Sequence, residues 1–299
     1  MRVDPDYISG LVASLNASSL SEQQLTAELS SGLRVSSLSD DPVAAGQASL
    51  LSSGISQDDS FVQTAATTEC MMQVTDAALS SVVTQLTSAV SLAVEGNSGT
   101  NSSSDLSSLS QQLSSIRDQV LSLANTSYQG TYIFAGSKGN IQPFTLDTTT
   151  SPATVTYNGD AQTGSLTTEN GQQLQTTLAG SSVFTAPGAN VMTALSNLVA
   201  DFASGSVSVT ASTDIGALQS ALGAVSQQQA ILGSSLQRIE SASSYAQTDA
   251  TNRTAAVTSL VSADPATVAT QLSSAETQNQ ALMSVISTVE KQSLFSYLD

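Results

Sequence analysis

The stretch that decides the fold class is residues 42–95, PVAAGQASLLSSGISQDDSFVQTAATTECMMQVTDAALSSVVTQLTSAVSLAVE. It contains no proline after Pro42, and its apolar residues recur at heptad-like spacing from Phe61 to Ala89. One continuous helix of this length would extend for roughly 80 Å at ~1.5 Å per residue. A compact globule made from the whole chain would be only about 50 Å across. The stretch therefore predicts an elongated helical rod, unless Gly54 interrupts the helix.

Both ends of the chain carry amphipathic helical patterns, over residues 6–33 and 265–298. Each of these stretches contains few charged residues, and a single helix has no means of burying its own apolar stripe. We therefore expect the two ends to pair with each other as a coiled coil and with other copies in an assembly. The residues expected at this interface are Leu11, Leu15, Leu25 and Leu29 near the start and Leu272, Leu282, Ile286, Val289 and Leu294 near the end.

The segment between the ends predicts more helices and one β-rich insert. Loop-forming residues at 96–104 separate the long helix from a heptad pattern over 106–123, which should run back antiparallel with Ser104 or Asp105 as its cap. Residues 154–157 alternate like a strand, and Asn158-Gly159 and Asn170-Gly171 are hairpin turn signals. Helical spacing then resumes, in a short helix over 191–202 and a long one over 218–260.

Two Asp-Pro pairs mark helix starts, Asp41-Pro42 and Asp264-Pro265, because Asp accepts a free amide and Pro has no amide to leave unpaired. The predicted fold is mainly α. It is an elongated antiparallel coiled-coil or helical-bundle rod built from both chain ends, with a small β-rich inserted domain. Its expected parts are a terminal domain from 1–40 plus 264–299, a helical rod from 41–136 plus 190–263, and the insert from 137–189.

Composition excludes several classes of function. Seven basic residues against 24 acidic ones give a formal net charge of -17, so the chain has no basic face for nucleic acid or anionic membranes. No run approaches the ~18 apolar residues that a membrane-spanning helix needs. Asp4 and Asp6 occupy the place of the apolar region of a secretory signal, so we expect any export to proceed without a cleaved signal peptide.

The chemistry-bearing residues favour structural interpretations. The chain has no His and a single cysteine, Cys70, which we expect to be a buried small hydrophobe. Of the adjacent carboxylates, Asp40-Asp41 should cap a helix and Asp58-Asp59 should lie on a solvated face, because neighbouring helical residues point about 100° apart. We therefore expect no enzyme, no metal site and no cofactor.

Four segments, in order along the chain, resemble the bacterial flagellin superfamily. They are LSSGLRVSSLSDDPVAAGQA (29–48), the central GTYIFAGSKGNIQPF (130–144) with VTYNGD (155–160) and GSLTTENGQQLQTTLAGSSVF (164–184), SADPATVATQL (262–272) and SLFSYL (293–298). The central segment is similar to that of the family's hook-filament junction members and not to that of flagellin.

This resemblance implies an extracellular structural part of the flagellum that joins the hook to the flagellin filament. The implied partners are identical copies in a ring, a hook-associated protein on the hook side, flagellin on the filament side and an export chaperone at the C-terminal helix. The family signature also favours Arg34 as an interface anchor over a plain surface charge. Two alternatives stay open: a minor flagellin that polymerises into the filament, and a coiled-coil stalk or signalling protein.

Overall fold

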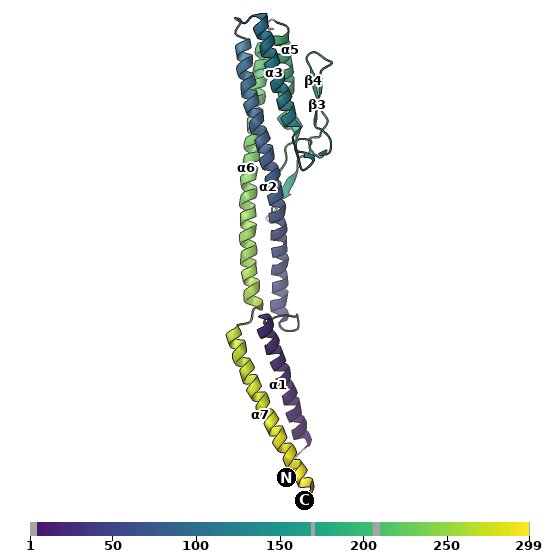
Figure 1. Cartoon of the computed structure of the whole chain (residues 1–299), viewed down its shortest axis with the longest axis vertical. Helices are drawn as coiled ribbons and strands as arrows, with labels where there is room; N and C mark the ends of the chain where they lie inside the picture. Colours follow the sequence, from purple (N-terminus) through teal and green to yellow (C-terminus); the bar gives the residue numbers. More distant parts are fainter. Residues whose placement is uncertain (1–4, 169–170, 206–209, 299) are drawn as a thin grey trace. The chain divides into compact units, whose positions relative to one another are not determined.

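The computed structural model describes residues 5–168, 171–205 and 210–298, and within these ranges it describes side-chain exposure for residues 9–288. The mainly helical fold with long helices and a small strand-containing insert is confirmed (Figure 1). The helices are α1 (Pro5–Ser31), α2 (Pro42–Gly96), α3 (Ser103–Ala124), α4 (Gly180–Val183), α5 (Val191–Ala203), α6 (Ala211–Val261) and α7 (Pro265–Leu298). Gly54 does not interrupt α2, which runs unbroken for 55 residues.

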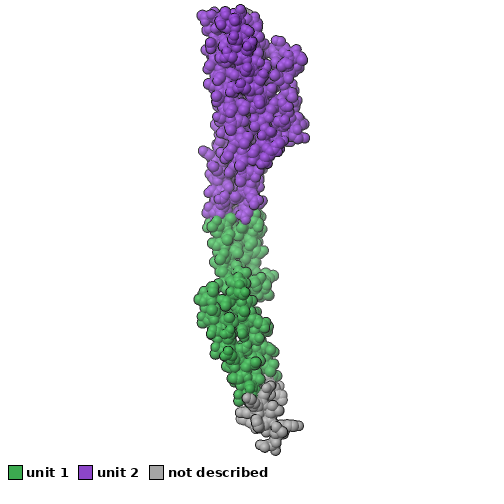
Figure 2. Space-filling model, in the orientation of Figure 1, with its two compact units in different colours: residues 1–57, 249–299 green, residues 58–248 purple. Residues whose placement is uncertain are grey.

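The chain divides into two compact units, coloured separately in Figure 2. Unit 1 contains Met1–Gln57 and Asp249–Asp299, and unit 2 contains Asp58–Thr248. The division falls inside α2 and α6, whereas the sequence suggested boundaries at the connections near residues 40 and 264. A helix continues across such a division because its backbone hydrogen bonds are local, whatever its side chains contact.

Unit 2 is built around a heptad seam between α2 and α6. Small and medium apolar residues seven positions apart are buried on both helices, and Gln229 Nε2 donates to Asp76 Oδ1 across them at 3.1 Å. The helix α3 packs on α5, where Ser110 Oγ donates to the Val199 carbonyl at 2.8 Å. The buried heptad residues are Ala65, Met72, Leu79, Leu86 and Ala93 on α2 and Leu218, Val225, Leu232, Ile239 and Ala246 on α6.

The start of α3 differs from the expectation. Ser102 is the N-cap, and it forms a capping box in which Asp105 is the third helical residue. The Ser102 side chain accepts from the Asp105 amide at 3.3 Å, and the Asp105 carboxylate accepts from the Ser102 amide at 3.0 Å. Ser104 therefore lies inside the helix, because the reciprocal pairing satisfies two free amides where a single cap satisfies one.

Among the described residues, the insert and the segment just before it form four two-stranded antiparallel hairpins. Their strands are β1 (Ser127–Tyr128) with β2 (Thr131–Tyr132), β3 (Phe144–Asp147) with β4 (Thr154–Tyr157), β5 (Ser165–Thr167) with β6 (Gln173–Gln175), and β7 (Thr185–Ala186) with β8 (Ala189–Asn190). The strand at 154–157 is confirmed, but Asn158-Gly159 follows β4 and does not connect two strands. Gly171 lies in the β5–β6 loop with φ +75°, while Asn170 lies outside the described residues.

Aromatic rings pack against one another inside the strand-containing region of unit 2. The ring centroids of Phe134 and Phe184 lie 5.2 Å apart, and those of Phe144 and Tyr157 lie 4.9 Å apart. The Tyr157 hydroxyl donates to the Phe134 and Asp160 carbonyls at 3.0 and 2.7 Å. This close packing explains why Asn158-Gly159 forms no hairpin loop, since Gly159 lies against the Tyr157 ring instead.

Three expectations about side chains and hydropathy were wrong. Cys70 is exposed, because it lies two helical positions, about 200°, from the buried Met72. Asp58 is fully buried, because it continues the α2 heptad one repeat before Ala65. By length and composition alone, α2 could also cross a membrane, since an 18-residue window in it has a mean hydropathy of 1.5. One third of that window is buried within the protein.

Candidate assembly interface

The helices α1 and α7 of unit 1 run side by side in opposite directions (Figure 1). Asn279 Nδ2 of α7 donates to Glu22 Oε2 of α1 at 2.8 Å, and this hydrogen bond links the two helices. Leu11, Leu15 and Leu25 are half-buried, whereas Leu29 is 41% exposed. On α7, Leu272, Leu282 and Ile286 are half-buried, and the side chains of Val289 and Leu294 lie outside the described residues.

Unit 1 has a very small core of its own. Among the side chains that the structure describes, only four buried apolar residues belong to it: Val35, Ala44, Val268 and Ala275. Two of these are alanines, which contribute little buried area. A pair of helices with so few buried side chains gains little stability from its own packing.

Unit 1 also carries most of the exposed large apolar side chains. Nine of the thirteen found among the described residues lie in it, although it contains 108 of the 299 residues. Concentrated apolar exposure of this kind marks surfaces that other proteins cover. The nine residues and their exposed fractions are Val12 44%, Leu20 62%, Leu29 41%, Leu33 38%, Leu38 67%, Val43 69%, Leu50 77%, Met283 57% and Val285 41%.

Hydrogen bonds join the connection after α1 to the end of α6. The Arg34 amide donates to the Val261 carbonyl at 2.8 Å, and the Ala263 amide donates to the Gly32 carbonyl at 2.9 Å. The Arg34 guanidinium donates to the Leu260 carbonyl at 2.9 Å and forms a 3.3 Å ion pair with Asp41. Arg34 thus supplies a positive group to free carbonyls at a helix C-terminus. Sequence reasoning missed this role within the chain.

Asp40 organises the turn inside this connection. One carboxylate oxygen accepts from the backbone amides of Ser36 and Ser37, both at 2.9 Å, and the two serine hydroxyls donate to the same carboxylate. These hydrogen bonds, led by that of the Ser36 amide, lower the pKa of Asp40 to about 2. The signal in the sequence is a short Ser-Ser run three and four residues before an Asp, a pattern typical of side-chain-closed turns.

Asp41 and Asp264 begin α2 and α7. Asp41 Oδ1 accepts from the Ala44 amide at 3.0 Å, which is the main reason that the pKa of Asp41 is lowered. Asp264 accepts from the Thr267 hydroxyl at 2.6 Å and from the Ala266 amide at 3.2 Å, and both bonds lower its pKa. Pro42 and Pro265 are the first residues of the two helices.

A second feature of unit 1 that sequence reasoning missed is the contact between Gly54 and Arg253. A Cβ atom added at Gly54 would lie 1.8 Å from Arg253 Nη1, so the guanidinium occupies the space that glycine leaves. Arg253 also forms a 2.5 Å ion pair with Asp249. Arg253 lies seven residues after the buried Ala246, so extending the heptad would have placed it on the seam.

Comparison with known proteins gives consistent matches. Residues 9–139 match the model of the bacterial flagellin N-terminal helical region, and residues 215–298 match that of the C-terminal helical region. The chain is 40% identical over 124 residues to flagellar hook-associated protein 3 of Salmonella typhimurium, and 39% identical over 120 residues to that of Escherichia coli. These stretches cover 40% and 39% of this chain and span 38% and 37% of the relatives' lengths.

Solved structures show the same fold. A flagellar hook-associated protein from Vibrio parahaemolyticus aligns with a TM-score of 0.63 and 20% identity, over 74% of this chain and 99% of that one. The flagellar junction protein FlgL from Legionella pneumophila aligns with a TM-score of 0.59 and 16% identity, over 73% of this chain and all of that one.

Proposed function

Because the chain belongs to the bacterial flagellin family, we propose that it is a structural subunit of the flagellum that joins the hook to the flagellin filament. The observation that carries the proposal is the distribution of apolar surface. Unit 1 has four buried apolar side chains and nine large exposed ones among the residues that the structure describes. A surface of this kind needs neighbouring subunits to cover it.

The proposed partners follow from the family and from the named relatives. Copies of the chain form a ring, with a hook-associated protein on the hook side and flagellin on the filament side. The assembled subunit is extracellular, after export through the flagellar apparatus without a cleaved signal peptide. Its contribution is shape and interface, and no step of catalysis is assigned to it.

A folding mechanism accompanies this role. Of the terminal segments 1–40 and 264–299, the described residues 5–40 and 264–298 are disordered in the free monomer and become ordered when subunits pack together. Ordering on binding costs about 2–5 kcal/mol of the gross interaction, which burial of the exposed apolar residues in the assembly offsets. Hydrogen exchange on the monomer tests this mechanism, and strong amide protection at both ends would rule it out.

The export chaperone is proposed to bind the C-terminal helix before assembly. Leu282 and Ile286 are half-buried when unit 1 is ordered, so they are accessible to a chaperone while the C-terminal segment is disordered. Replacing both with Ser should weaken chaperone binding in a titration and should reduce assembly. Unchanged binding would count against this partner.

Single substitutions test the interface in unit 1. Leu20→Ser removes a 62% exposed side chain, so we expect the fold to survive while incorporation at the hook tip falls. Ile141→Ser is the matched control, because Ile141 is 44% exposed but lies in the insert. Equal incorporation of the two variants would contradict the assignment of the interface to unit 1.

The junction role itself is tested in cells that lack the gene. Electron microscopy should show hooks without filaments, with unpolymerised flagellin in the medium. A minor flagellin would instead leave filaments on the hooks, and the purified protein would form long fibres. Normal filaments on every hook would therefore refute the junction role.

A further inference from the structure

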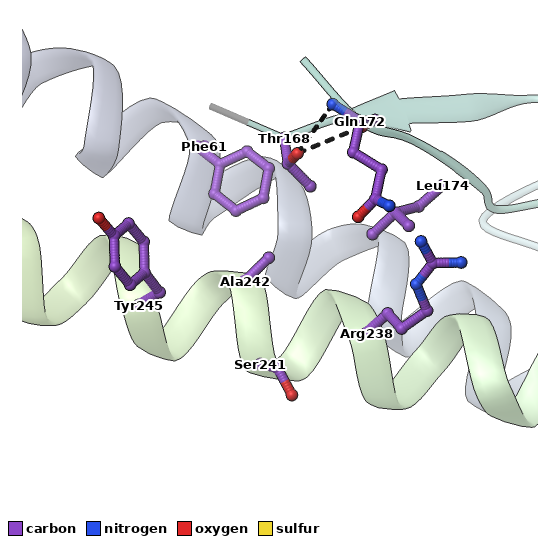
Figure 3. Close-up of a pocket in the computed structure, with 8 residues that line it drawn as sticks. All are labelled: Phe61, Thr168, Gln172, Leu174, Arg238, Ser241, Ala242 and Tyr245. Carbon is purple, nitrogen blue, oxygen red and sulfur yellow. Dashed lines mark hydrogen bonds between the residues drawn. The ribbon is translucent and has the colours of Figure 1, made fainter. Parts of the chain in front are cut away.

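A groove of about 300 Å³ lies in unit 2, where the β5–β6 hairpin crosses α2 and α6 (Figure 3). Its apolar lining consists of Phe61 from α2, Leu174 from β6 and Ala242 from α6. Leu174 is 2% exposed, and the other two are half-buried. Three segments far apart in the sequence therefore build one site, which exists only when the insert is folded onto the helices.

The hairpin side of the groove is held by its own hydrogen bonds. The Gln172 amide donates to Thr168 Oγ1 at 3.2 Å, and that hydroxyl donates to the Gln172 carbonyl at 3.3 Å (Figure 3). These two bonds tie the backbone of Gln172 to the Thr168 side chain at the edge of the groove. The groove is thus pre-formed, which lowers the entropy cost of filling it.

Two residues of α6, Arg238 and Tyr245, flank Ala242 along the groove (Figure 3). They are seven residues apart, so they share one face of the helix. Tyr245 is 59% exposed, and it is the aromatic member of the exposed large apolar side chains that the structure describes. Tyr and Arg beside an apolar floor are the residue types that dominate binding energy at protein interfaces.

Arg238 differs from the other basic residues that the structure describes. Arg34, Arg117 and Arg253 each form an ion pair, and Lys138 donates a 3.5 Å hydrogen bond to the Asn158 carbonyl. Within the described part of the chain, Arg238 has neither kind of partner. Its guanidinium therefore lines the groove with no such partner among the described residues, in a geometry that matches a carboxylate.

We propose that this groove receives an Asp or Glu side chain, together with an adjoining apolar side chain, from a second copy of this chain. The inference rests on the proposed function, because assembly is what brings copies side by side. Charge complementarity favours this occupant, since each copy carries 24 acidic residues against seven basic ones. The volume suits one or two side chains, because an α-helix with its side chains is about 10–12 Å wide and would not enter.

Photocrosslinking in assembled flagella tests the proposal. Tyr245 is replaced with p-benzoyl-L-phenylalanine in the full chain, flagella are isolated after irradiation, and the crosslinked peptides are identified by mass spectrometry. We expect a dimer of this chain whose second peptide contains Asp or Glu next to an apolar residue. A crosslink to a different protein, or a second peptide without an acidic residue, would overturn the proposal.

A parallel crosslinker at Leu20 separates this inference from the proposed function. If position 20 crosslinks to flagellar subunits while position 245 does not crosslink to a second copy, only the groove proposal fails. If neither position crosslinks to a flagellar subunit, the assembly role fails with it.

Charge variants test the part assigned to Arg238. Arg238→Gln should lower the yield of the Tyr245 dimer about ten-fold, which corresponds to ~1.4 kcal/mol of association free energy. Lys138→Gln is the matched control, because it removes one positive charge from unit 2 outside the groove. An unchanged yield in Arg238→Gln, or an equal loss in Lys138→Gln, would refute recognition of a carboxylate in the groove.

Discussion

Because Arg253 lies against Gly54, we expect Gly54→Ala to destabilise the protein when Arg253 is present and to stabilise it when Arg253 is replaced by Ala. In a helix, Gly→Ala normally stabilises by about 1 kcal/mol. At Gly54, however, the new Cβ would lie 1.8 Å from Arg253 Nη1 and 2.8 Å from Cζ, so the arginine must move. Arg253 and Asp249 are only 29% and 27% exposed, so this movement disturbs a partly buried ion pair.

The magnitude follows from these two opposing effects. Overpacking costs about 1–3 kcal/mol, so Gly54→Ala alone should lower the free energy of unfolding by a net ~0–2 kcal/mol after the helix gain of about 1 kcal/mol. In an Arg253→Ala background the obstruction is gone, and the same change should raise that free energy by about 1 kcal/mol. The coupling between the two sites is therefore about 1–3 kcal/mol.

The assay is hydrogen exchange with mass spectrometry on residues 42–57 and 249–261, supported by urea unfolding followed by circular dichroism. Gly46→Ala is the matched control, because α2 leaves open space around Gly46. It should stabilise equally with and without Arg253. The reasoning is refuted if Gly54→Ala stabilises the intact chain as much as Gly46→Ala does.

Three further perturbations have defined outcomes. The pKa of Asp40 is lowered to about 2 from 3.8, so the stability it contributes is present above pH 3.8 and is lost as the pH falls towards 2. In the assembled subunit, where this turn is ordered, solid-state NMR should show the Ser36 and Ser37 amide shifts constant from pH 7 to 5 and changing below 4, with no such change in Asp40→Asn. Burial and the nearby Glu240 raise the pKa of Glu69, so its contribution to stability falls as the pH rises through that pKa. Glu69→Gln should therefore reduce the difference between urea midpoints at pH 4.5 and pH 7, and an unchanged difference would exclude this carboxyl as the cause. Gly180→Ala places a Cβ 2.7 Å from the Phe134 carbonyl oxygen and should destabilise by about 1–3 kcal/mol. Gly223→Ala, in open space on α6, should not destabilise, and urea midpoints compare the two.

Seven-residue spacing is why so much of the fold could be predicted from the sequence. The buried positions of α2 from Ala65 to Ala93 and those of α6 from Leu218 to Ala246 follow it without a gap. The bounds of α2, α5 and α7 lie within one residue of the pattern, because Asp-Pro pairs and glycine-rich loops interrupt helices locally, whereas α6 begins seven residues before the pattern does. The local sequence was therefore sufficient to predict where α2, α5 and α7 begin and end and which of these heptad positions are buried.

Some of the errors arose where the deciding neighbour is distant in the sequence. Asn158-Gly159 has the composition of a hairpin turn, but Tyr157 bonds to the Phe134 carbonyl and holds that backbone in another path. Arg34 was expected to be an interface anchor, which stays a prediction, but its bond to the Leu260 carbonyl at the end of α6 was not foreseen. Asp58 was assigned to the surface from its residue type, although the heptad of α2 placed it in the core. In that case the periodic pattern was the better guide than polarity.

A polar residue on a heptad seam has a physical use in a chain of this composition. The buried heptad positions of α2 from Ala65 to Ala93 and of α6 from Leu218 to Ala246 are all Ala, Leu, Val, Ile or Met, so a slip by one heptad would bury similar side chains there. In unit 1, Arg253 makes one register of α2 against α6 more favourable than the others. Only glycine leaves room for its guanidinium, and a slip by one heptad would bring Arg253 against Gln47 or Phe61 instead of Gly54. Single polar residues at core positions are known to fix register at a cost in stability. A subunit that must present one defined surface to its neighbours needs that register more than it needs the lost stability, so Gly54 and Arg253 are best understood as a pair.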